Sequence, residues 1–149
     1  MLDIGMNDIA KITDEHWKSK IKALVLTCKS IANQFDSGVT VCFLEVIPRV
    51  GFTRRNMTPA KFEERANYFN SLLSLEQGKA LRQSPPSNFR YGKMQGWRNF
   101  SMGNRYYQRD YSEMLSRDGI HPTIKELRKR YASSVKKAIL LPRNFPGRI

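Results

Sequence analysis

Apolar residues in the first third of the chain change their spacing twice. The opening MLDIG is typical of the end of a short apolar strand, and GMND of the loop that follows it. A helix is expected from Thr13 or Asp14, both good N-caps, to about Phe35. Residues 39–48 are apolar at nearly every position and end in a proline, as in a strand buried on both faces. Together these elements predict a βαβ unit.

The second half of the chain predicts two more helices and one more strand. Residues 58–80 begin with a threonine cap and a proline in the first turn, which indicates a helix. Residues 88–97 predict a strand, whereas residues 98–114 show no clear period. The strongest helix runs from Pro122 to Leu141, with apolar residues on one face and basic residues mostly on the other.

Length and composition are those of a single folded domain. The chain has 149 residues, of which 40% are hydrophobic and 11% aromatic, enough for one core. It contains no apolar run of about eighteen residues, the minimum for a membrane helix. Its amino-terminal segment carries acidic residues where a signal peptide would be basic and then apolar. We therefore expect an intracellular protein with no membrane partner.

The cysteine and histidine content favours neither a disulfide framework nor a metal site. Cys28 and Cys42 fall inside apolar segments and are expected to be reduced, buried thiols. His16 and His121 are the only histidines, and the carboxylates near them form no familiar ligand spacing. His16 is expected in the first turn of a helix as a solvated surface residue.

Asp118 and His121 stand three residues apart in RDGIHPTIKEL, directly before a proline that fits the start of a helix. Taken alone, this pair is also typical of a helix cap beside a structural histidine. Active sites of α/β folds lie outside the carboxyl ends of parallel strands, where Asn7 is also expected. The succession GMND, EVIPR and DGIHPT resembles the SGNH (GDSL-type) hydrolase family, including SGNH-like modules of animal retroelement-derived proteins. The resemblance is best at residues 1–50 and 111–141.

The resemblance implies a fold and a set of roles. The fold would be a partial flavodoxin-like, three-layer α/β/α arrangement with about three parallel strands and flanking helices. Residues 1–141 would form one domain, and residues 142–149 a basic tail. The substrate would be a small ester, and no cofactor would be needed.

The roles implied for single residues are those of an acyl-ester hydrolase. Asn7 would donate to the oxyanion, and Gly5 would allow the tight turn beside it. His121 would be the general base, and Asp118 would orient its imidazole.

One part of the family pattern is missing. The nucleophile should stand in a Gly-Asp-Ser motif before Asn7, but all twelve serines follow Asn7 and none has that context. Ser37, in the sequence DSG, should face the opposite edge of the sheet. Loss of the first strand would also expose a central strand as an edge, which natural sheets avoid. We therefore expect a truncated domain that lacks its N-terminal third and is inactive alone.

The uneven charge distribution favours nucleic acid as an alternative partner. Residues 1–48 hold five Lys and Arg against six Asp and Glu, whereas residues 49–149 hold 21 against seven. The segment 90–137 combines this basic excess with aromatic residues, a mixture that can neutralise phosphates and stack bases. A nucleic-acid-binding module is the alternative function. The simpler interpretation is that the aromatic residues pack in the core and the charges are solvated.

Overall fold

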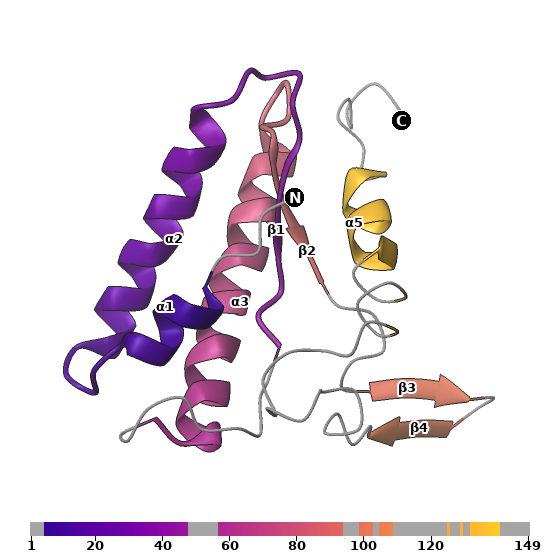
Figure 1. Cartoon of the computed structure of the whole chain (residues 1–149). Coiled ribbons are helices and arrows are strands. Elements are labelled where there is room, and N and C mark those ends of the chain that lie inside the picture. The colour runs from indigo at the N-terminus through magenta and orange to yellow at the C-terminus, as the bar shows by residue number, and fades with distance from the viewer. Residues whose placement is uncertain are drawn as a thin grey trace.

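The computed structural model describes residues 5–47, 57–93, 99–102, 105–108 and 132–140, together with positions 125 and 129. The helices are α1 (Met6–Lys11), α2 (Trp17–Asn33), α3 (Pro59–Arg82) and α5 (Ala132–Ile139). The strands are β1 (Val41–Leu44), β2 (Phe89–Gly92), β3 (Asn99–Met102) and β4 (Arg105–Gln108). Figure 1 shows α2 and α3 side by side. Strands β1 and β2 lie between this pair of helices and α5. The architecture is a mixture of helices and a small parallel sheet.

The parallel sheet consists of β1 and β2. Val41 lies opposite Phe89 and Leu44 opposite Gly92, and α3 is the connection between the two strands. Helix α3 packs against β2, so β1, α3 and β2 form a β-α-β unit. The βαβ unit that the sequence predicted over residues 1–48 includes the strand ending at Ile4, which lies outside the described residues. The prediction of a strand buried on both faces is confirmed, because all four residues of β1 are buried.

Alternate residues of the strands enter two different clusters. Val41, Phe43, Phe89 and Tyr91 pack with α2 and α3, and the rings of Phe43 and Phe89 stack with centroids 5.0 Å apart. Cys42, Leu44 and the downstream Ile47 pack with Ala138 of α5. Helices therefore cover both faces of the sheet.

The start of α2 differs from the prediction. Helix α2 begins at Trp17, and His16 precedes it with a left-handed φ of 55°. Neither predicted cap is used: Asp14 binds Arg65 and Lys61 of α3, and the Thr13 hydroxyl accepts from Lys20. The contact with α3 thus takes the Asp14 carboxylate, and a lysine side chain of α2 itself takes the Thr13 hydroxyl, so neither group caps the helix. His16 is solvated as expected, with a side chain 76% exposed and 3.4 Å from Glu15.

Helix α3 agrees closely with the helix predicted from the sequence. The Thr58 hydroxyl accepts from the backbone N–H of Lys61 at 3.1 Å, and Pro59 occupies the first helical turn. This cap and the apolar stripe confirm the helix predicted at residues 58–80.

The later part of the chain confirms some predictions and leaves others outside the described residues. Antiparallel β3 and β4 form a hairpin with Phe100 opposite Tyr107, in a region where the sequence predicted no element. Helix α5 occupies the second half of the helix predicted at 122–141. The strand predicted to end at Ile4 and the tail 142–149 lie outside the described residues.

Candidate functional site

The carboxyl end of β1 is the edge at which the sequence predicted an active site. Gly5 lies there, buried, with φ 117°, a conformation that L side chains rarely adopt. A Cβ on Gly5 would come within 2.9 Å of Phe69 Cε1 and 3.0 Å of Val46 Cγ2. Both the backbone angle and the lack of space require glycine. The expectation of a tight turn at Gly5 agrees with this geometry.

Asn7 follows this turn directly. It is the second residue of α1 and is exposed, whereas Ile9 and Ala10 of the same helix are buried. The Gly5 carbonyl accepts from Ile9 N at 2.7 Å, and α1 packs against α3. Buried residues therefore anchor the helix, whereas Asn7 is exposed.

Asn70 of α3 fixes the chain beyond β1. Its side-chain oxygen accepts from Val46 N at 2.9 Å, and its side-chain nitrogen donates to Val46 O at 2.8 Å. Asn70 is 6% exposed and Val46 is 1% exposed. The amide thus satisfies both backbone groups of Val46 as a neighbouring strand would. Since Val46 also lies against the Gly5 turn, Asn70 helps to fix the position of that turn.

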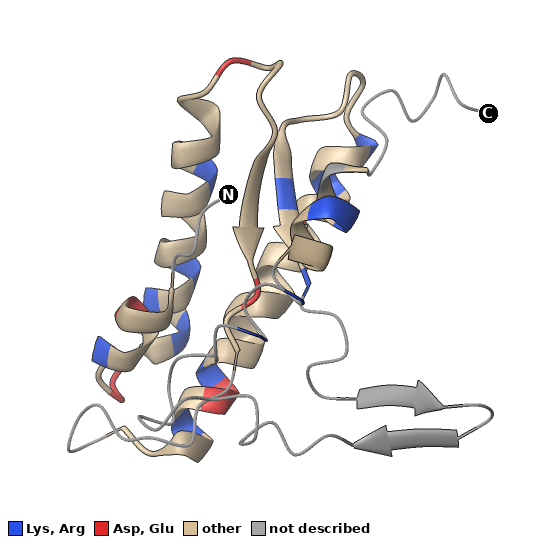
Figure 2. Cartoon of the chain, turned by 45° about the vertical axis from the view of Figure 1, so that its right-hand side comes forward, with Lys and Arg blue, Asp and Glu red and all other residues tan. Residues whose placement is uncertain are grey.

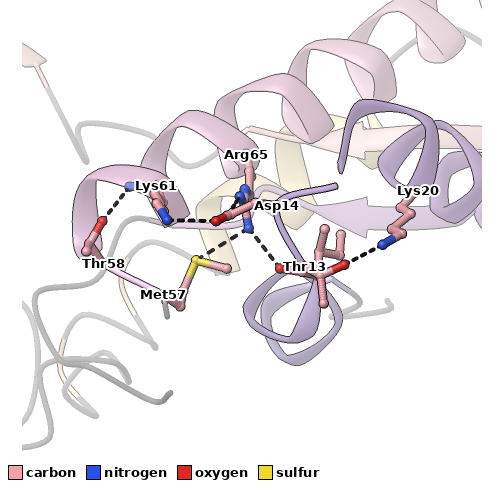
Figure 3. Close-up of polar contacts among 8 residues, drawn as sticks. Thr13, Asp14, Lys20, Met57, Thr58, Lys61 and Arg65 are labelled. Carbon is pink, nitrogen blue, oxygen red and sulfur yellow. Dashed lines mark hydrogen bonds and ion pairs between the residues drawn. The ribbon is translucent and has the colours of Figure 1, made fainter. Parts of the chain in front are cut away.

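An ion-pair cluster holds the segment between α1 and α2 against α3 (Figure 3). The side chain of Arg65 is only 4% exposed; it donates to the Ile12 carbonyl at 2.8 Å and pairs with Asp14. Lys61 also pairs with Asp14 at 3.0 Å, and the Arg65 guanidinium lies 5.5 Å from the Trp17 ring centroid. Hydrogen bonds from Arg65 and then Lys61 lower the pKa of Asp14. This cluster fixes the carboxyl end of α1.

Two of the four predicted site residues can be placed. Gly5 and Asn7 lie together at the carboxyl edge of β1. Asp118 and His121 lie outside the described residues, so their predicted pairing stays a prediction. Ser37 lies beside Asn88 and Arg90 at the amino ends of the strands, the edge opposite Gly5, as the sequence indicated.

Asn70 is the residue that the sequence reading missed. It follows Ala66 by four residues and precedes Leu73 by three, so it falls within the apolar stripe of α3. A polar residue at such a position needs a buried hydrogen-bond partner. That requirement was the available signal, although it does not identify Val46 as the partner.

The two thiols are structural, as expected. Cys28 and Cys42 are free and buried, and burial raises the pKa of Cys28 to about 12. Burial also raises the pKa of Cys42. A thiol in this state is a poor nucleophile. Among the described residues, no group of three or more potential metal ligands is found.

Part of the basic aromatic segment belongs to the core. Arg90 is 2% exposed and Tyr91 is 8% exposed, so neither can form an open nucleic-acid surface. Exposed lysines instead follow α2 and α5, as the blue ribbon segments in Figure 2 show. Within the part of the chain that the structure describes, no helix is both long and apolar enough to cross a bilayer.

Comparison with models of known protein families finds no match, and searches of curated proteins and of solved structures also find none.

Proposed function

We propose that this chain provides the oxyanion donor and the acid–base pair of an SGNH-type acyl-ester hydrolase site. Asn7 would donate its amide N–H to the oxyanion, and His121, oriented by Asp118, would be the general base. The observation that carries the proposal is the obligatory glycine turn at Gly5, which begins the helix of Asn7 at the carboxyl edge of β1. Ligands of α/β folds bind at this edge.

The arrangement of the helices and strands supports the three-layer, flavodoxin-like fold that this function needs. Strands β1 and β2 are parallel neighbours, and helices cover both faces of the pair. The N–H groups of Val41 and Glu45 donate toward β2, whereas that of Val46 donates to Asn70. Because backbone N–H groups of a strand alternate in direction, the other edge of β1 can accept a further strand. We assign this place to the strand predicted to end at Ile4, within a three-layer, flavodoxin-like fold.

The proposed site still lacks a nucleophile. No serine of the chain stands in a Gly-Asp-Ser motif, and Ser37 lies at the wrong edge. A base without a nucleophile within hydrogen-bond reach supports little covalent catalysis. The chain alone should therefore hydrolyse nitrophenyl acetate no faster than its His121→Ala variant. A clear difference between the two would show that residues 1–149 contain a nucleophile.

The acid–base pair can be tested without turnover, by following the two histidines through a pH titration in NMR spectra. The Asp118 carboxylate should raise the pKa of His121 above the ordinary value of about 6.5, because it favours the imidazolium. Asp118→Asn should remove this increase, and the resonances of exposed His16 provide an internal reference. Identical titration curves for His121 in both proteins would refute the pair and the hydrolase assignment.

A second candidate function is nucleic-acid binding by the basic half of the chain. The observation that favours it is the β3–β4 hairpin, in which Phe100 lies opposite Tyr107 and Ser101 opposite Tyr106. Hairpins that carry aromatic residues among basic ones can serve as base-stacking platforms. Salt-dependent binding would distinguish this function from the hydrolase proposal.

A further inference from the structure

Helix α1 carries Asn7, the proposed oxyanion donor, and is only six residues long. A helix of this length does not form alone in water, because too few hydrogen bonds follow the costly first turn. A catalytic donor must be held within about 0.5 Å of its productive position. Contacts from outside α1 therefore have to fix the position of Asn7.

Asn70 of α3 acts at the amino end of α1. Its side chain binds both backbone groups of Val46. Val46 and Phe69 lie so close to Gly5, the N-cap of α1, that no side chain would fit there. Movement of Val46 would change the space in which Gly5 turns. Asn70 thus fixes the start of α1 through the backbone of Val46.

Arg65 of α3 acts at the carboxyl end of α1. Its Nη1 donates to the carbonyl of Ile12, the C-cap of α1, at 2.8 Å. Its Nη2 pairs with Asp14 in the connection to α2 (Figure 3). The Arg65 side chain is only 4% exposed, so protein groups rather than water have to satisfy its charge. These contacts fix the end of α1 against α3.

Ile9 joins the two ends of α1. Its N–H donates to the Gly5 carbonyl at 2.7 Å, and its carbonyl accepts from Ile12 N at 3.2 Å. Its side chain is 0% exposed and belongs to the same apolar cluster as Phe69. Asn7 precedes Ile9 by two residues. Displacement of either end of α1 would therefore reach Asn7 through a short hydrogen-bonded path.

We propose that Asn70 and Arg65 are positioning residues for Asn7, which they hold by fixing the two ends of α1 from a single helix. The inference rests on the proposed function of Asn7 as oxyanion donor. Each residue acts through backbone groups, Asn70 through Val46 and Arg65 through Ile12. The donor is then in place before an oxyanion forms, as electrostatic stabilisation requires.

Native-state hydrogen exchange of the full chain, followed by NMR, tests the proposal. The Ile9 N–H reports opening of α1, whereas the most protected amides of α2 report global unfolding. In the wild type, Ile9 should exchange faster than those amides. We expect Asn70→Leu and Arg65→Met each to accelerate Ile9 exchange by about tenfold or more, because each leaves buried polar groups without partners.

Three further variants complete the design. Arg65→Lys can still donate to one of the two partners of Arg65 and should recover part of the lost protection. Asn70→Asp keeps the bond from Val46 N and supplies the measurement if the leucine variant does not fold. Asn33→Ala, at an exposed position of α2, should change Ile9 exchange by less than about twofold.

A role in overall stability alone predicts a different pattern. The α2 amides would then exchange faster in Asn70→Leu and Arg65→Met, while Ile9 kept its wild-type rate, and this result would overturn the proposal. Equal wild-type rates for Ile9 and the α2 amides would also overturn it, since α1 would then open only with the whole fold. Neither result bears on the titration of His121, which tests the hydrolase assignment separately.

Discussion

The side chain of Asn70 makes two hydrogen bonds with the backbone of Val46, one as donor and one as acceptor, and both residues are buried. Replacement by leucine should leave the N–H and C=O of Val46 without partners. A buried group that loses its partner costs about 1–3 kcal/mol, so we expect Asn70→Leu to lower the free energy of unfolding by about 2–4 kcal/mol. Urea denaturation measures this loss.

Asn33→Ala, at the exposed end of α2, is the matched control and should change stability by less than about 0.5 kcal/mol. Asn70→Asp should fall between wild type and the leucine variant, because a carboxylate can accept from Val46 N but cannot donate to Val46 O. Equal stability of Asn70→Leu and wild type would contradict the role of Asn70.

The turn at Gly5 predicts a sharp contrast between two glycines. Gly5→Ala should cost about 1–3 kcal/mol, since its φ of 117° is strained for alanine and its Cβ would collide with Phe69. Gly38→Ala should be neutral or slightly stabilising, because its Cβ would meet no atom within 4 Å. Thermal unfolding of both variants tests the contrast. A Gly5→Ala protein as stable as Gly38→Ala would show that the turn is tolerant.

Asp14 should contribute to stability in a pH-dependent way. Arg65 and Lys61 lower its folded-state pKa below the ordinary value of 3.8. The contribution is therefore complete above pH 3.8 and is lost as pH falls through the folded-state pKa. We expect Asp14→Asn to be less stable than wild type near neutral pH and equal to it in strong acid, as measured by urea denaturation.

Arg65→Met supplies the control for this pH dependence. In that background, the stability loss caused by Asp14→Asn should shrink at neutral pH, because the principal partner of the carboxylate has been removed. An undiminished loss would mean that Asp14 acts without Arg65.

The nucleic-acid alternative predicts a steep salt dependence. If the basic half binds single-stranded nucleic acid, removal of Arg98, Arg105 and Arg109 together should flatten the slope of log K against log salt by roughly two units, at about 0.7 for each phosphate contact. Fluorescence anisotropy with a labelled oligonucleotide measures the slope. Neutralising the exposed Lys18, Lys20 and Lys22 of α2 provides a charge-matched control. Equal slopes for the two triple variants would leave only nonspecific attraction.

Local signals predicted the elements that local interactions determine. Helix α3 was predicted because Thr58 and Pro59 provide a start signal next to its own apolar stripe. The predicted start of α2 was wrong because Asp14 binds Arg65, a residue far away in sequence, instead of capping α2. The β3–β4 hairpin was missed although Gly103 and Asn104, a pair common in two-residue hairpin loops, separate its strands in the sequence.

The candidate site was predictable only in part for the same reason. Gly5 and Asn7 belong to one short motif, so their proximity follows from the chain itself. The contact of Gly5 with Phe69 and the two hydrogen bonds between Asn70 and Val46 depend on how α3 docks. Docking of this kind depends on packing between distant segments, which a periodicity does not encode.

The proposed hydrolase site requires Asn7 and His121 to face each other at the carboxyl edge of the sheet, and cysteine cross-linking measures whether they do. Cys28 and Cys42 are buried with raised pKa values, so the introduced cysteines should react first with a short bismaleimide. We expect rapid intramolecular cross-linking in the Asn7→Cys, His121→Cys protein. The control pair is Ser37→Cys with His121→Cys, since Ser37 lies at the opposite edge, and it should remain uncross-linked. Cross-linking of the Ser37 pair but not of the Asn7 pair, read by mass spectrometry of the peptides, would contradict the account.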